Sequence, residues 1–149
     1  MMQYSKFVVV LGLAGCVLSS CSKDSPKPDT TVVHNPITVR VSEAGAPDYA
    51  LSDAYVESAL YDGKISRLSI TGKLASGKVI VLNFSRLPNS SAPVYTTDQF
   101  ESTLGGVSAT SVSGSSIYSP QTKTVDGTFT ATFAGTGVVA GGFAAVQTL

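Results

Sequence analysis

A strict alternation of residue character organises the last third of the chain. Between Val125 and Ala134, apolar residues or glycine occupy every second position, and Asp126 and three threonines lie between them. Successive side chains of a β-strand point to opposite faces, so this period of two is typical of a strand with one face in a core and one in water. The segment predicts a strand whose Phe129 and Phe133 are core residues.

Similar alternation begins at residue 37 and is interrupted by turn sequences. Tyr61-Asp62-Gly63-Lys64 contains the Asp-Gly pair that a two-residue type I′ hairpin turn favours, and Ser76-Gly77-Lys78 and Gly135-Thr136-Gly137 indicate two further turns. We therefore expect an all-β fold, an antiparallel β-sandwich or open barrel of about seven to nine strands. The expected strands are 37–42, 54–60, 67–74, 79–85, 94–96, 107–113, 115–119, 125–134 and 138–146.

Several segments require a choice. Residues 49–60 fit either a short helical stripe or the first arm of a hairpin, and the Asp-Gly turn that follows favours the strand.

Residues 98–104 predict a helical turn capped by Thr97 or Asp98. Residues 107–113 and 115–119 predict two polar strands at a sheet edge. In 79–85, Ile80, Leu82 and Phe84 face the core, and Val79 and Val81 on the opposite face predict a central strand with apolar cover on each side. The last strand is expected to place Val139, Gly141, Phe143 and Ala145 on one side.

The N-terminus has the three parts of a secretory signal. Lys6 precedes twelve apolar residues at 7–18, a run that suits a signal peptide and is too short to span a bilayer. Leu18-Ser19-Ser20-Cys21 then resembles the lipobox of bacterial lipoproteins, in which the Cys thiol carries, through a thioether, a diacylglycerol with acyl chains such as palmitate. These features predict a lipoprotein signal peptide at 1–20, a lipidated Cys21 with a disordered tether at 21–35, and one β domain at 36–149.

Leu13-Ala14-Gly15-Cys16 fits the lipobox pattern as well, which makes Cys16 the alternative lipidation site. Cleavage there would shorten the apolar run, whereas Cys21 is followed by the polar, Pro-containing segment 22–29 that cannot form a core. Cys21 is therefore the preferred site. With Cys21 acylated and Cys16 removed, the mature chain has no free thiol, so disulfides, zinc-thiolate sites and cysteine nucleophiles are excluded.

Charge and length narrow the function classes. From Ser22 onward the chain has nine Lys and Arg against ten Asp and Glu, and it lacks the clustered basic face that nucleic acid requires. The roughly 128 residues after Cys21 suffice for one domain with a modest core. The expected partners are the membrane, through the N-terminal lipid, and an envelope protein or a glycan; nucleic acid is not expected.

The order of the β motifs resembles a group of short β-rich Bacteroidota lipoproteins of uncharacterised function. Those proteins typically have a Gly-Thr-Phe strand followed by a closing Gly-Phe strand, here Gly127-Thr128-Phe129 and Gly142-Phe143, and the likeness extends loosely over most of 54–149. Lys23-Asp24 likewise resembles their surface-export signal. The resemblance implies a β fold and a lipid-anchored location in the outer membrane, at its periplasmic face or the cell surface. It implies no activity.

The sequence offers no catalytic constellation. The single histidine, His34, lies in the tether, and the carboxylates of Asp48, Asp53, Glu57 and Asp62 occupy one stretch without the Trp residues that commonly line a glycan cleft. We therefore predict a protein that is not an enzyme and has neither cofactor nor metal site. It would be a non-catalytic binding or structural accessory module. The alternatives are a small envelope hydrolase acting on glycan and a pilin-like assembly subunit that uses strand addition.

Tyrosines supply the candidate binding residues. Five of them, at 49, 55, 61, 95 and 118, would offer stacking surfaces for a glycan or peptide, or would cover sheet edges and cap the core. Loops at the sheet ends are the usual place for recognition. Tyr61 at a hairpin tip and Tyr95 at the end of 86–95 are therefore the predicted contacts.

Mass spectrometry of the mature N-terminus tests the lipidation site. We expect a peptide that begins at Cys21 and carries the mass of a diacylglycerol, because the apolar run, the small residues and the polar tether all converge there. An unmodified start at Ser22, or acylation of Cys16, would contradict this prediction.

Overall fold

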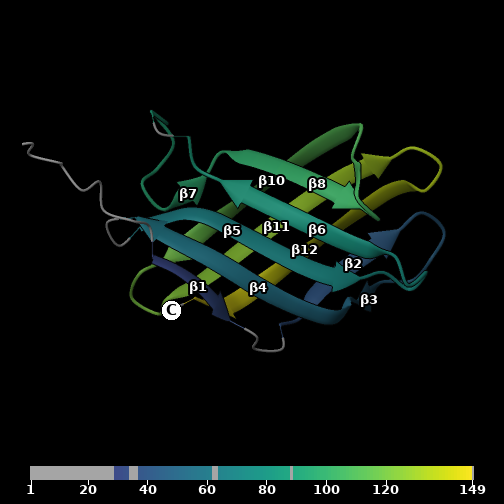
Figure 1. The fold of residues 1–149 in the computed structure, drawn as a ribbon, viewed down its shortest axis with the longest axis horizontal. Helices are drawn as coiled ribbons and strands as arrows, with labels where there is room; N and C mark the ends of the chain where they lie inside the picture. Colours follow the sequence, from purple (N-terminus) through teal and green to yellow (C-terminus); the bar gives the residue numbers. More distant parts are fainter. Residues whose placement is uncertain (1–28, 34–36, 62–63, 88, 149) are drawn as a thin grey trace, which may run out of the picture.

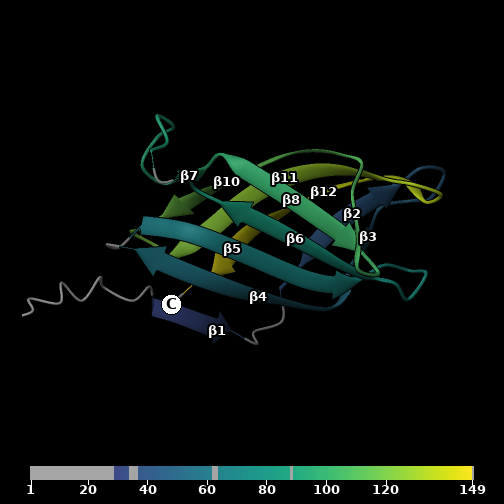
Figure 2. The ribbon, with the colours of Figure 1, turned by 45° about the horizontal axis from the view of Figure 1, so that its top comes forward.

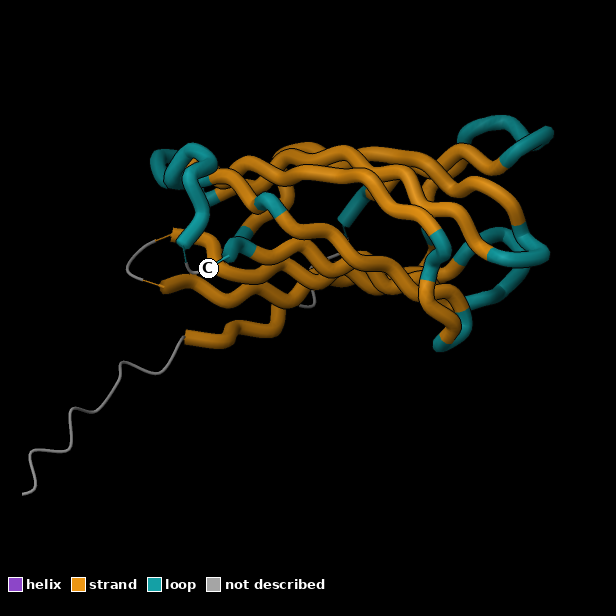
Figure 3. The backbone as a smooth tube through the Cα atoms, turned by 90° about the horizontal axis from the view of Figure 1, so that it is seen from above, coloured by secondary structure: helices purple, strands orange, loops and turns teal. Residues whose placement is uncertain are grey.

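The architecture is a two-layered antiparallel β-sandwich. The computed structural model describes residues 29–33, 37–61, 64–87 and 89–148, and these residues form twelve strands in two six-stranded sheets that face each other (Figures 1 and 3). Three strands have two residues each, which leaves nine of five or more. The described residues contain no helix that could span a bilayer. The predicted all-β sandwich is confirmed.

The first sheet has the order β1-β4-β5-β6-β8-β9, and every neighbouring pair is antiparallel. It contains the hairpin of β4 and β5, which pairs Tyr61 with Lys64 across the predicted two-residue turn; the turn residues themselves lie outside the described set. The strand bounds are β1 Asp29–Val33, β4 Ser52–Tyr61, β5 Lys64–Lys73, β6 Val79–Ser85, β8 Gln99–Leu104 and β9 Val107–Ser108.

The second sheet has the order β3-β2-β12-β11-β10-β7, again antiparallel throughout. It lies behind the first sheet in Figure 1, and Figure 2 shows the same two layers after a tilt. The strand bounds are β2 Val39–Glu43, β3 Tyr49–Ala50, β7 Thr96–Thr97, β10 Ser111–Ser119, β11 Thr124–Phe133 and β12 Gly137–Gln147.

The core fills the space between the sheets with the inward residues of both. On β11 the predicted alternation is confirmed, because Phe129 and Phe133 are buried while Thr128 and Thr130 are exposed. Burial of so many aliphatic and aromatic side chains supplies the main stabilising free energy, at about 1.5–3 kcal/mol for each large side chain. The largest fully buried side chains are Phe84, Ile65, Leu68, Ile70, Leu74, Ile80, Leu82, Val39, Val41, Val56, Val125 and Val139.

Glycines of the second sheet make room for phenylalanine rings. Gly127 is the cross-strand partner of Phe143, and Gly141 is the partner of Phe129. A Cβ added at Gly127 would overlap the Phe143 ring, and one at Gly141 would collide with the Arg40 carbonyl oxygen and crowd Phe129. Each ring therefore covers the backbone of the facing strand, an arrangement that fills the volume a missing side chain leaves.

The predicted helical turn at 98–104 is wrong, because Gln99–Leu104 is strand β8. Phe100, Ser102 and Leu104 are buried at every second position, and each pairs in register with an inward residue of β6. Pairing and burial with period two outweigh the local helix signal at Thr97 and Asp98, since intrinsic propensity is a weak prior against tertiary contacts.

The two polar strands predicted at 107–113 and 115–119 are also rearranged. β9 is only Val107–Ser108, at the edge of the first sheet, while Ser111–Ser119 runs unbroken through Gly114 as β10 in the second. A Cβ at Gly114 would lie 2.9 Å from the Phe100 ring, so this glycine marks a close approach of the two sheets and not a turn.

The parity of the last strand changes near its end. Val139 and Phe143 are buried as predicted, but Ala145 is exposed and Val146 is buried. The register places residues 144 and 145 opposite the single residue Asp126, which is a β-bulge, and Ala145 has a φ of 50°. The Asp126 carboxylate accepts a hydrogen bond from the Ala145 amide at 2.7 Å and so fixes the bulge.

Two further expectations need correction. The tether was predicted to continue to residue 35, but Asp29–Val33 forms β1 and pairs with β4 along its whole length. β6 is central in its sheet, as predicted, but on its outer face Val79 is exposed and Val81 only half-buried, so this face is less covered than the inner one. The ambiguous segment 49–60 is strand, in β3 and β4, which confirms the preferred alternative.

Phe129→Ala should lower the free energy of unfolding by about 3–5 kcal/mol, because the buried ring would leave a cavity beside Phe100 and Gly141. Urea melts measure the change. The adjacent Thr130→Ala, on the exposed face of the same strand, should change stability by under about 0.5 kcal/mol. A loss below about 1 kcal/mol for Phe129→Ala would contradict the packing described above.

Candidate functional site

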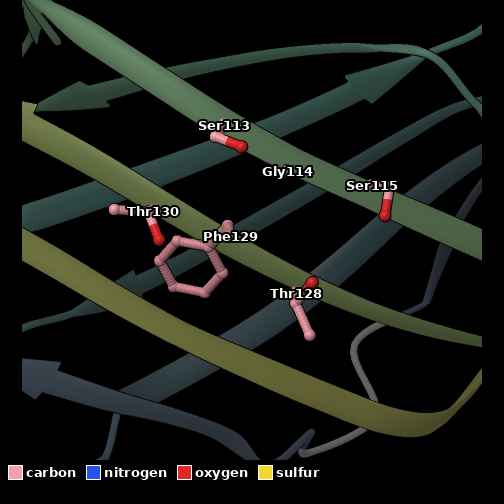
Figure 4. Close-up of a pocket in the computed structure, with 6 residues that line it drawn as sticks. All are labelled: Ser113, Gly114, Ser115, Thr128, Phe129 and Thr130. Atoms are coloured by element: carbon pink, nitrogen blue, oxygen red, sulfur yellow. The ribbon is translucent and has the colours of Figure 1, made fainter.

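The outer face of the second sheet carries short hydroxylated side chains in register. Ser113 lies opposite Thr130, and Ser115 lies opposite Thr128, on adjacent strands β10 and β11. These four residues, which we call the hydroxyl face, line a shallow hollow of about 310 Å³ together with Gly114 and Phe129 (Figure 4). A hydroxyl both donates and accepts hydrogen bonds, so the face suits a polar ligand of varied geometry.

Two further hollows continue across the sheet. One, of about 270 Å³, is lined by Ser115 and Thr128 and adds Ile117, Asp126 and Phe143; the other, of about 380 Å³, lies over β2 and β12. Arg40 lines the latter beside its pairing partner Gly142. Neighbouring hollows share lining residues, so they form one open surface. The Arg40 guanidinium group lies near one side of this surface, and the Asp126 carboxylate lies near its middle.

The hydroxyl face leads into an apolar surface at one end of the sandwich. Pro93, Val94, Tyr95, Ile117 and Pro120, which we call the Tyr95 surface, line part of a hollow of about 340 Å³. Val94, Tyr95 and Ile117 are 47%, 39% and 55% exposed. The Tyr95 ring meets the buried Tyr118 ring edge-on, with centroids 6.1 Å apart, which fixes the orientation of Tyr95.

Arg86 holds the segment that carries Val94 and Tyr95. Its guanidinium group donates hydrogen bonds to the carbonyl oxygens of Pro93 at 2.6 Å, Ala92 at 2.7 Å, Thr96 at 2.8 Å and Ser90 at 3.4 Å. The planar fork of an arginine reaches several acceptors at once, and hydrogen bonds from an ionised donor are stronger than neutral ones. The loop is thus organised around one cation.

Asp98 fixes the other side of the same loop. Its Oδ1 accepts a hydrogen bond from the Leu87 amide at 2.9 Å. Hydrogen bonds from the Ser90 side chain and from that amide, together with the nearby Arg86 charge, hold the pKa of Asp98 below its ordinary value. The ionised form is therefore the one that the folded loop favours.

Asp53 and Tyr49, which were considered in the sequence as candidate polar and binding residues, each form a local contact in the structure. Asp53 forms an exposed ion pair with Lys73 at 2.7 Å, and this bond raises the pKa of Lys73. Tyr49 donates a hydrogen bond to Glu43, and burial first and then this bond raise its pKa. Among the described residues, no three His, Cys, Asp or Glu side chains gather as metal ligands.

Of the residues singled out in the sequence, the structure places some and leaves others outside the described set. Tyr95 is exposed and Tyr118 is a core residue. Tyr61 ends β4 at the same end of the sandwich as the Tyr95 surface, but its side chain is not among those described. Cys16, Cys21, His34 and Asp62 lie outside the described residues.

The hydroxyl face was not predicted. The threonines of β11 were expected on a solvated face, yet the alignment of Ser113 and Ser115 beside them depends on the register of β10, which a glycine in mid-strand obscured. Comparison of the chain with protein-family models, with curated proteins and with solved structures found no match. The function of this surface is therefore argued from its chemistry.

Arg86→Gln should lower the free energy of unfolding by about 1.5–3 kcal/mol, because several carbonyl groups lose a charged donor. Arg86→Lys should restore little of this loss, since an ammonium cannot reach the same set of acceptors. Urea melts measure both. Arg67→Gln, at an exposed position on β5, is the matched control and should be nearly neutral; equal effects at 67 and 86 would contradict the assigned role.

Proposed function

We propose that the protein is a non-catalytic binding or structural accessory module of the cell envelope, held in the outer membrane by acyl chains on Cys21. The signal-like N-terminus and its lipobox support the anchor. Two or more acyl chains hold a protein firmly at a bilayer, whereas one gives marginal binding. Anchoring leaves the β-sandwich to present its surface to a partner.

The observation that carries the binding role is the open surface that runs from the Tyr95 surface across the hydroxyl face to Arg40. Hydrogen-bonding groups along paired strands keep fixed spacings, and an apolar end with a tyrosine supplies contact area. A glycan or an extended peptide has matching chemistry, since both alternate polar groups with apolar patches. Tyr95 and Tyr61 remain the proposed contacts at the end of this surface.

Thr130→Lys tests the role of the hydroxyl face. The acylated protein is purified from its own envelope with whatever partner it retains, and we expect the variant to recover about tenfold less partner, because a long charged side chain would occupy the hollow that Ser113 and Thr130 line. Thr71→Lys, on the outer face of the first sheet, is the control and should retain the partner.

Both variants should melt within a few degrees of the parent, because both positions face outward from their sheets. Partner recovery that is equal in the two variants would contradict the assignment of the hydroxyl face. A hydrolytic turnover that co-purifies with the parent and is lost in a variant of this surface would contradict the non-catalytic role.

A further inference from the structure

The Tyr95 surface lies at the end of the sandwich where the tether enters. We propose that this surface, together with Leu87, contacts the lipid bilayer in which the protein is anchored, and so serves as a second membrane contact; the proposal rests on the anchor at Cys21. It divides the proposed surface between two partners: the apolar end with Tyr95 contacts the lipid interface, and the hydroxyl face alone remains for a glycan or peptide.

The pairing of the first sheet places Asp29, the residue that follows the tether, at the same end as this loop. Asp29 pairs with Leu60, Leu60 pairs with Ile65, and the amide of Arg86 donates to the carbonyl oxygen of the next residue, Ser66, at 2.9 Å. These steps cross from β1 to the start of the 86–95 loop over three interstrand spacings, roughly 14 Å. The chain therefore enters the domain close to the loop that carries Val94 and Tyr95.

The length of the tether then limits the distance from the bilayer. Eight residue steps separate Cys21 from Asp29 and span at most about 28 Å when fully extended. A ten-residue strand such as β4 or β5 is itself roughly 33 Å long. An anchor on Cys21 thus keeps the tether end near the membrane, while the opposite end lies a further strand length away.

The side chains at the tether end suit a lipid interface. Leu87, Val94, Tyr95 and Ile117 are all exposed, three of them on or beside one loop that Arg86 holds in place. Tyrosine is enriched at membrane interfaces because its ring is apolar and its hydroxyl is polar. Because Arg86 already holds this loop in place, little conformational entropy is lost when its side chains contact the lipid.

Exposure alone would not select this end. Val79, Val107, Val112 and Val138 are also exposed, and they lie at or near the strand ends on the opposite side of the sandwich (Figure 1). The tether distinguishes the two ends, since it joins the domain at Asp29 beside Leu60. With the Tyr95 surface against the bilayer, the two sheets stand upright and the hydroxyl face stays open to solvent.

Bromolipid quenching tests the contact. The sequence contains no Trp, so Val94→Trp in the acylated mature protein introduces one tryptophan, whose fluorescence is excited apart from that of the tyrosines. The probe is a vesicle of phosphatidylethanolamine and phosphatidylglycerol with brominated acyl chains. We expect about a twofold loss of fluorescence, because interfacial contact buries side chains roughly 5–10 Å deep, within reach of the bromines. Leu87→Trp provides a second reporter in case one variant folds poorly.

Val107→Trp is the matched control, since Val107 is 63% exposed and lies at the opposite end of the first sheet. It should show little quenching in the same vesicles. Sedimentation with the vesicles separates the possible failures. A protein that does not sediment lacks the anchor, which overturns the proposed attachment and this inference together. A protein that sediments but shows equal quenching at 94 and 107, or none at 94 and 87, overturns the second contact alone.

Discussion

Contact between phenylalanine rings from opposite sheets is the constraint on which the rest of this sandwich depends. Phe84 and Phe100 of the first sheet stack with centroids 4.6 Å apart, Phe143 of the second meets Phe84 edge-on at 5.5 Å, and Phe129 lies 6.1 Å from Phe100. Aromatic pairs in such geometries contribute beyond the area that they bury. Four rings in one cluster need more volume than a uniform row of side chains would leave, and glycines at 114, 127 and 141 provide it.

This core arrangement also determines the character of the outer face. The glycines and phenylalanines alternate with outward positions on β10 and β11, and apart from Ile117 and Asp126 those outward positions carry serine and threonine. Short side chains above a backbone leave hollows, since no long side chain folds back over the sheet. The same strands therefore contribute to the aromatic cluster on their inner face and carry the polar hydroxyl face on their outer side.

The sequence predicted the elements whose pattern is local and missed those that depend on pairing partners. β11 was predicted nearly to its bounds, because its alternation is complete over ten residues. β8 was mistaken for a helical turn, because Thr97 and Asp98 resemble a cap and only the pairing with β6 shows the strand. Ala145 is exposed and Val146 is buried, opposite to the predicted alternation, because a bulge held by the Asp126 carboxylate shifts the register of β12 on β11. The local pattern of β12 does not show this bulge.

β1 would connect the proposed lipid anchor of the chain to its fold. Asp29–Val33 was predicted as tether but pairs with β4, so seven residues, and not the predicted fourteen, separate Cys21 from the first strand. A strand at a sheet edge loses backbone freedom in exchange for ladder hydrogen bonds, and here it also covers part of the open edge of β4. Under the proposed anchor, the short stretch of sequence between Cys21 and Asp29 would hold the end of the sandwich that contains Asp29 near the membrane. With Cys21 anchored as proposed, the register of β1 on β4 would set which end of the domain lies nearest the membrane.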